Sequence, residues 1–343
     1  MLSEKNSRYL YKQILNEDLI YEHINERYSL MAENTETIKQ DLGIINTHKD
    51  KIIIEIDYVE KIKEELQKNK KRKKKLDLIH KNFLIELEQL PTSLKSSTNG
   101  NSTTGFVVWQ SSFFFLNWLF KENGNQFLNW DEGNNFDIIE IGAGVNCSNS
   151  IILSNFTKNF YISSDQKGIL NKLKSNCKNN LKEIQLYNNT IKNADRGMET
   201  NCERIFRSDS LEVNLVKDDS KEVKDFRFEV LHLDWCEDAT YSEFISEIDY
   251  VNVDAKARLT ILAIDVIYNE FLIEPFIKTV KRLLTLRENS QAIVVLQLRD
   301  EDIIIDFLSS CIDVFLVEVI EDVDTEEGVF SRSRHVIYKL SKL

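Results

Sequence analysis

The sequence predicts an α/β fold whose mostly parallel sheet ends in one antiparallel hairpin. From Gly105 onward, short runs of β-branched and aromatic residues alternate with segments whose apolar residues recur at helical spacing, a pattern typical of strands joined by crossover helices. The last two runs, residues 314–320 and 335–340, are joined by an acidic turn. Strands joined by a turn rather than by a crossover run antiparallel.

Each expected strand is a short apolar run that is followed by a turn or by a helical pattern. Strands are expected at residues 136–141, 159–164, 227–233, 259–264, 292–298, 314–320 and 335–340. Helices are expected at residues 111–120, 166–182, 270–286 and 301–310. Residues 183–225 are rich in Asn, Asp, Glu and Lys with little periodicity, which favours an inserted loop.

Residues 1–103 differ in pattern and are interpreted as an N-terminal extension with a linker, ahead of one domain at 104–343. Residues 51–54 form a short apolar run, and residues 76–90 carry apolar side chains at helical spacing before Pro91, so a helix is expected there. The polar segment 92–104 indicates a linker. The basic segment from Lys68 to Lys75 favours a solvated helix face or loop; nuclear targeting and a contact with ribosomal RNA are the alternatives.

Composition excludes several classes of protein. The 343 residues are 42% hydrophobic and 29% charged, which is typical of globular proteins, and no segment approaches the roughly 18 apolar residues of a membrane span. The net charge of −12 argues against a surface that coats nucleic acid and permits a basic partner. Five scattered cysteines and an N-terminus without an apolar core favour a reducing, intracellular compartment.

The strongest local motif is the sequence from Glu140 to Gly144, which ends the first expected strand in a Gly-Ala-Gly turn. Glycines at this place let a backbone approach a ligand at the sheet edge; a tight packing turn is the alternative. A dinucleotide-binding loop would have a third glycine at position 147, which is Cys147, so the motif favours a ligand without phosphates.

Further candidate residues follow the next three strands. Asp165 follows the second strand, where a carboxylate can accept hydrogen bonds from both hydroxyls of a ribose or cap the next helix. Trp235 follows the third strand, where an aromatic ring can cover a flat base. Asp265 and Tyr268 follow the fourth strand. No hydrolase site and no metal site are expected.

The order of these motifs resembles the seven-β-strand S-adenosylmethionine-dependent methyltransferases, and within them the lysine-directed branch called methyltransferase family 16. That branch has a tryptophan before the first strand, here Trp109, an E-x-G-x-G loop, and an acid after the second strand. A leucine-acid-tryptophan and a D-x-x-Y motif follow, here Leu233 to Trp235 and Asp265 to Tyr268. The strings around Asp165 and Asp265 are similar to those of fungal enzymes that methylate ribosomal proteins. The resemblance covers roughly residues 104–343 and departs from the branch at residues 145–147.

The resemblance implies a Rossmann-like seven-stranded sheet and S-adenosyl-L-methionine as cofactor. It also implies the residues of the site: Trp109, Glu140, Gly142, Ala143, Gly144, Asp165, Trp235 and Ile264 for the cofactor, and Asp265 and Tyr268 for the acceptor lysine. Glu140 is expected near the amino group of the cofactor, and Asp165 on its ribose. The implied partner is a basic protein of the large ribosomal subunit. The protein is expected to be a monomer in the cytoplasm or the nucleus. No membrane contact and no sequence-specific binding of nucleic acid are expected.

Other functions stay open at this point. Another protein, such as an elongation factor, could be the methyl acceptor. An NAD(P)-type oxidoreductase shares the strand, loop and acid, but it leaves the final hairpin and the D-x-x-Y motif unexplained. A binding module without catalysis is a third alternative. Within methyltransferases, a nucleic acid or small molecule as acceptor remains, although the N-P-P-Y motif used on nucleobases is absent.

Overall fold

The computed structural model describes residues 8–33, 43–62, 77–95, 104–130, 135–184, 212–214, 225–248, 256–324 and 328–343. The strands are β1 (Tyr9–Ile14), β2 (Lys51–Ile62), β3 (Asp77–Glu88), β4 (Phe136–Ile141), β5 (Phe160–Asp165), β6 (Glu212–Asn214), β7 (Asp225–His232), β8 (Arg258–Ile264), β9 (Ser290–Gln297), β10 (Phe315–Asp322) and β11 (His335–Lys342). The α-helices are α1 (Glu17–Glu33), α3 (Gln110–Lys121), α4 (Gly124–Phe127), α5 (Ser148–Leu153), α6 (Lys167–Asn180), α7 (Asp238–Glu247), α8 (Ile273–Leu284) and α9 (Glu301–Ile312). Short 3₁₀ turns lie at Pro91–Lys95, Thr104–Phe106, Leu181–Glu183 and Glu270–Leu272.

The main sheet has the strand order β1-β10-β11-β9-β8-β4-β5-β7-β6. Strands β9, β8, β4, β5 and β7 run parallel to one another, whereas β11 runs antiparallel to both β9 and β10. This confirms the expected class, the seven expected strands and the final hairpin. The sheet has nine strands rather than seven among the described residues, because β1 and β6 add one antiparallel strand at each edge.

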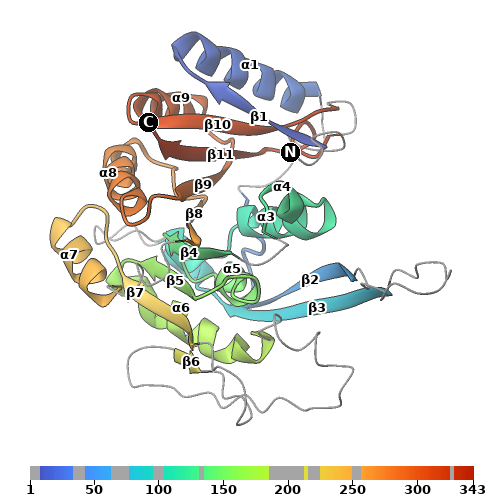
Figure 1. The fold of residues 1–343 in the computed structure, drawn as a ribbon, viewed down its shortest axis with the longest axis vertical. Helices are drawn as coiled ribbons and strands as arrows, with labels where there is room; N and C mark the ends of the chain where they lie inside the picture. The colour runs from blue at the N-terminus through green and yellow to red at the C-terminus, as the bar shows by residue number, and fades with distance from the viewer. Residues whose placement is uncertain are drawn as a thin grey trace.

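Helices cover both faces of the sheet, and each face buries its own apolar core. Successive residues of β4 alternate between the two cores: Ile138 packs with α3, α5, α6 and the β2–β3 pair, and Ile139 packs with α1, α7, α8 and α9. Figure 1 shows these two layers on opposite sides of the sheet. A strand buried on both faces reads as a continuous apolar run, which explains why the parallel strands were the easiest elements to predict. No helix in the described parts of the chain is long and apolar enough to cross a membrane.

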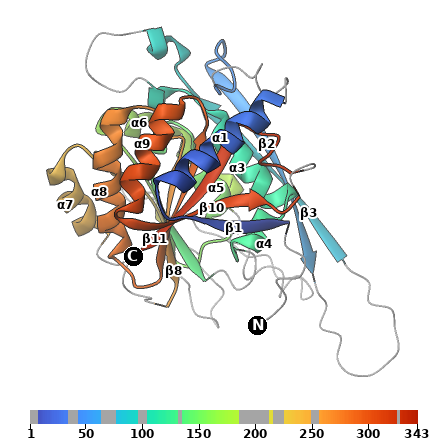
Figure 2. The ribbon, with the colours of Figure 1, turned by 90° about the horizontal axis from the view of Figure 1, so that it is seen from above.

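Part of the N-terminal extension is built into the main sheet. Strand β1 pairs with β10 along its whole length, and helix α1 packs beside α9, as both views show (Figure 2). Neither β1 nor α1 was expected from the sequence. The division of the chain at residue 104 stays a prediction.

The expected helix at residues 76–90 is wrong, because this segment forms strand β3. Strands β2 and β3 pair over twelve residues as a separate antiparallel ribbon. Along β3 the side chains of Phe83, Ile85 and Leu87 are buried, while the residues between them face outward, which is the period of a strand. The second edge of β3 is hydrogen-bonded as well: the side-chain amides of Asn176 and Asn180 on α6 each donate to and accept from its backbone.

Two predicted segments lie largely outside the described residues. The basic segment from Lys68 to Lys75 is one of them. The other is the expected insertion at 183–225, of which the structure describes residues 183–184, β6 and the first residue of β7. Of the expected linker, residues 92–95 belong to a 3₁₀ turn.

Candidate functional site

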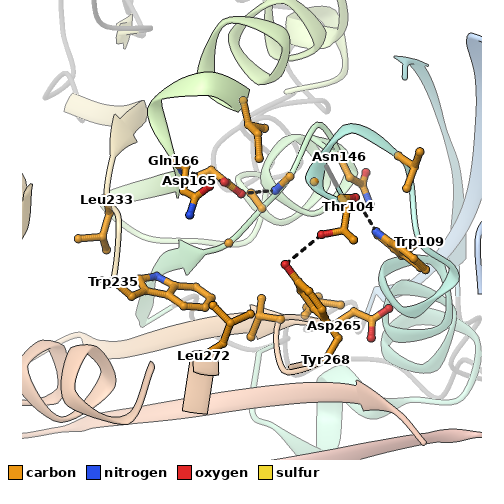
Figure 3. Close-up of a pocket in the computed structure, with 18 of the residues that line it drawn as sticks. Thr104, Trp109, Asn146, Asp165, Gln166, Leu233, Trp235, Asp265, Tyr268 and Leu272 are labelled. Carbon is orange, nitrogen blue, oxygen red and sulfur yellow. Dashed lines mark hydrogen bonds between the residues drawn. The ribbon is translucent and has the colours of Figure 1, made fainter. Parts of the chain in front are cut away.

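A cavity lies over the carboxyl ends of β4, β5, β7 and β8, where ligands bind in open α/β sheets. It holds about 820 Å³ of space that no protein atom fills, part of which is open to solvent. Nine of the ten predicted site residues line it: Trp109, Gly142, Ala143, Gly144, Asp165, Trp235, Ile264, Asp265 and Tyr268. Figure 3 shows Asp165 and Trp235 on one side of the open space, and Thr104, Trp109 and Tyr268 on the other.

The glycine loop needs both of its glycines for space and for backbone conformation. Gly142 has a φ of +70°, and a Cβ there would lie 2.7 Å from Val266 Cγ1 and 3.0 Å from the ring of Trp235. Gly144 has a φ of +62°, and its Cβ would lie 3.0 Å from the carbonyl oxygen of Gly105. Side chains are strained in this left-handed region. The absence of a side chain at Gly142 thus lets the loop pack against Trp235 at the base of the cavity. At Gly144 it lets the loop backbone pack against the backbone of Gly105.

Asp165 ends β5 and points into the cavity. Its Oδ2 accepts a hydrogen bond from the Gly144 backbone N–H at 2.6 Å, and its Oδ1 accepts one from the Gln166 N–H at 2.7 Å. Burial raises the pKa of this carboxyl to about 6, and the two amide hydrogen bonds oppose that rise. Within the described residues no cation forms an ion pair with it. Each oxygen therefore keeps a lone pair for a donor in the cavity.

Glu140 is the predicted residue that does not line the cavity. Its side chain faces the core on the α5 side, where it accepts hydrogen bonds from Asn149 Nδ2, the Tyr161 hydroxyl and the Ser163 hydroxyl, each at 3.0 Å. Burial raises the pKa of this carboxyl to about 7. The same Asn149 amide group donates to Ser112, which does line the cavity. Glu140 is thus two side chains away from the cavity, and its expected place near a cofactor amino group stays a prediction.

Asp265 is held by an arginine that sequence analysis missed. It has a φ of +59°, and its carboxylate, 3% exposed, forms a two-point ion pair with Arg299. The guanidinium of Arg299 lies 4.9 Å from the centre of the Trp109 ring. Arg299 directly follows the fifth expected strand, residues 292–298, so the rule that found the other residues, a polar side chain after a strand, would have found it too.

Tyr268 and Thr104 meet across the mouth of the cavity. The Thr104 hydroxyl donates to the Tyr268 hydroxyl at 2.9 Å, and Trp109 Nε1 donates to the Thr104 carbonyl at 3.0 Å (Figure 3). Tyr268 is 38% exposed, so it forms part of the entrance. Several other lining residues were not expected from the sequence, because no motif marks them; these are Thr104, Asn146, Gln166, Ile169 and Leu272.

The strand order, the reversed strand β11 and the site at the carboxyl ends of β4, β5, β7 and β8 define a Rossmann-like methyltransferase. Known proteins agree with this class. A ribosomal lysine N-methyltransferase 5 from Vanderwaltozyma polyspora is 32% identical over 358 aligned residues, which cover 95% of this chain and 98% of that protein. Proteins of the same name from Lachancea thermotolerans and Saccharomyces cerevisiae are 32% and 29% identical, over 92% and 96% of this chain and 94% and 98% of theirs. The chain therefore belongs to the ribosomal lysine N-methyltransferase 5 family.

Two other comparisons add little to this result. No family model matches the chain. A solved methyltransferase domain, described as bacterial-CtHen1-CN, aligns with 64% of this chain and 97% of its own at 12% identity and a TM-score of 0.32, which is too low to carry an argument.

Proposed function

We propose that the chain transfers a methyl group from S-adenosyl-L-methionine to a lysine of a basic large-subunit ribosomal protein. The observation that carries the proposal is Asp165, a buried carboxylate at the end of β5. Among the described residues it accepts hydrogen bonds from two backbone amides alone, which leaves lone pairs for the two hydroxyls of a ribose. The choice of a lysine in a ribosomal protein as the methyl acceptor rests on the name of the family to which the chain belongs. An NAD(P)-type oxidoreductase is less well supported, because it leaves the reversed strand β11 unexplained.

The lining residues fit this cofactor without a metal or a phosphate site. Trp235 stands against Gly142 and offers its ring to the adenine, and the turn from Gly142 to Gly144 admits the cofactor close to the backbone. Trp109 and Ile264 supply ring and aliphatic surface on the methionine side. Among the described residues no group of His, Cys, Asp and Glu side chains is arranged to hold a metal ion.

The sulfonium of the bound cofactor supplies an activated methyl group, so the protein's tasks are positioning and the reception of an uncharged amine. Positioning of two reactants can lower a barrier by roughly 7–11 kcal/mol. Lysine has a reference pKa near 10.4, and burial among Trp109, Tyr268 and Thr104 disfavours its ammonium form. Asp265 and Tyr268 steer the lysine side chain at the entrance. We also propose that the chain acts as a monomer in the cytoplasm or the nucleus.

The test is an incubation of the purified protein with methyl-labelled S-adenosylmethionine and large-subunit ribosomal proteins from cells that lack this protein. We expect one labelled basic protein and, by mass spectrometry, a methylated lysine in it; the Asp165→Ala variant should leave that protein unlabelled at limiting cofactor. Label in RNA or in a small molecule, or a melting temperature raised by NAD(P) and not by S-adenosylmethionine, would overturn the proposal.

A further inference from the structure

The orientation of the Asp265 carboxylate is determined by a residue that lies outside the cavity. In Figure 3 this carboxylate points away from the open space between Trp235 and Tyr268. Both of its oxygens bind the guanidinium of Arg299, which does not line the cavity. Two-point pairing of this kind fixes the plane of a carboxylate as well as its distance.

Arg299 is itself enclosed on two further sides. The Trp109 ring lies on one side, 4.9 Å from the guanidinium carbon. On another side the N-terminal extension passes close by, since a Cβ on Gly43 would lie 3.1 Å from an Arg299 nitrogen. Gly43 is fixed there by the Gln110 backbone N–H, which donates to its carbonyl at 2.5 Å. The extension, α3 and the end of β9 thus hold one arginine in one orientation.

The other charged and titratable groups around Asp265 do not take over this role. His335 on β11 lies close enough to feel the charge of Asp265, but burial lowers the pKa of the imidazole to about 4, so it is uncharged at neutral pH. Arg27 on α1 donates to the carbonyls of Phe330, Ser333 and His335 instead. Tyr268 bonds to Thr104 across the entrance. Arg299 is therefore the cation paired with Asp265 among the described residues.

This pairing matters because only the neutral amine of the acceptor lysine can attack the methyl group. A buried carboxylate without a cation would stabilise the ammonium form of a lysine beside it and keep its proton in place. A guanidinium on that carboxylate compensates the charge and turns the oxygens away. With its charge compensated, the Asp265 carboxylate does not hold the arriving lysine in a salt bridge.

We propose that Arg299 is a positioning residue for methyl transfer: it holds Asp265 away from the acceptor side of the cavity and compensates its charge, so that an entering lysine is not trapped as an ammonium ion. The inference rests on the proposed function, and it adds to it a residue that acts through Asp265 rather than on the substrate.

The experiment compares the pH dependence of kcat, and KM for the protein substrate, in the wild type, Arg299→Met and Arg299→Lys. In Arg299→Met we expect kcat at pH 7 to fall about tenfold or more and its half-maximal pH to rise by about one unit, because one pKa unit is a tenfold change in the neutral amine. KM should stay equal or fall, since the unpaired carboxylate binds the ammonium. Arg299→Lys keeps the charge but loses the planar fork, so its pH midpoint should return to the wild-type value with a lower kcat.

Two controls separate this role from a structural one. Arg282→Met removes a partly buried arginine that pairs with the exposed Asp238 and should leave kcat, KM and the pH midpoint unchanged. If Arg299→Met does not fold, Arg299→Gln removes the charge and keeps hydrogen-bonding capacity, and the same rise of the pH midpoint is expected in it. Variants that lose kcat or melting temperature without moving the pH midpoint would overturn the inference and leave the proposed function standing. A wild-type protein that methylates no lysine would overturn both.

Discussion

Asp165 and Asp265 are two buried aspartates at one edge of one sheet, yet their surroundings differ in kind. Asp165 ends β5 and Asp265 directly follows β8, and these two strands flank β4. Asp165 is held by two backbone amides, and burial raises its pKa to about 6. Asp265 is held by the guanidinium of Arg299. The difference teaches that one carboxylate keeps its lone pairs for a ligand, whereas the charge of the other is already compensated within the protein.

Removing the acceptor-side carboxylate should have the largest effect on turnover. Asp265→Ala leaves the guanidinium of Arg299 uncompensated beside the entrance, and we expect methyl transfer to fall by about 100-fold or more, the scale of a lost buried ion-pair partner. Cofactor affinity, measured by calorimetry, should change by less than about threefold. Asp265→Asn distinguishes the loss of the charge from a strained backbone, because asparagine tolerates the left-handed φ at this position, whereas alanine does not. Retained turnover in both variants would remove Asp265 from the site.

A side chain at Gly142, between the Asp165 side and the Asp265 side of the cavity, should reduce both the stability of the protein and its affinity for the cofactor. Gly142→Ala forces a side chain into a left-handed φ and against Val266 and Trp235, which we expect to cost about 2–5 kcal/mol of unfolding free energy. Cofactor binding should be lost in the same variant. Gly168→Ala is the matched control: it sits in α6 with open space around it and should stabilise the protein by up to about 1 kcal/mol. A Gly142→Ala protein of wild-type stability would contradict the packing described here.

Glu140 is a third buried carboxylate; it does not line the cavity, and no cation in the described part of the chain pairs with it. Because its pKa is raised to about 7 in the folded protein, the folded state binds the proton more tightly than the unfolded chain. Its contribution to stability is therefore full below about pH 4.5 and is lost as the pH rises to about 7, on the order of 3 kcal/mol. Glu140→Gln should flatten this fall in urea denaturation measured from pH 4 to pH 8. An unchanged slope in the variant would show that Glu140 is not the group responsible.

On the cofactor side the expected effect is smaller than on the acceptor side. Asp165→Ala removes a hydrogen-bond acceptor for the ribose, and we expect a loss of about 1.5–3 kcal/mol, or roughly 10- to 100-fold, in the affinity for S-adenosylhomocysteine. In the wild type the affinity should also weaken below about pH 6, where Asp165 takes up a proton. Asp238→Ala, which changes an exposed carboxylate paired with Lys278 and Arg282, should leave it unchanged. Equal affinity in all three proteins would place the ribose elsewhere.

The parallel strands and the residues that follow them could be predicted because burial on both faces leaves a continuous apolar run, and the runs of β4, β5, β7 and β8 end at the site. The β2–β3 ribbon could not, because the apolar residues of 76–90 fit helical spacing as well as alternation, and the partners that decide between them are β2 and the two asparagines of α6. Strand β1 was missed for the same reason: a short edge strand depends on β10. The position of the Glu140 side chain could not be predicted either, because the E-x-G-x-G motif does not specify whether this side chain faces the cavity or the core beside α5.

The central claim is that the two halves of the cavity divide the work, with the ribose on Asp165 and the acceptor beside a compensated Asp265. A crystal structure with S-adenosylhomocysteine bound tests this most directly. We expect both ribose hydroxyls within hydrogen-bonding distance of the Asp165 carboxylate, the adenine against Trp235, and the pair of Asp265 and Arg299 intact. A ribose bound to Asp265 with Arg299 displaced, or a ligand outside this cavity, would contradict the claim.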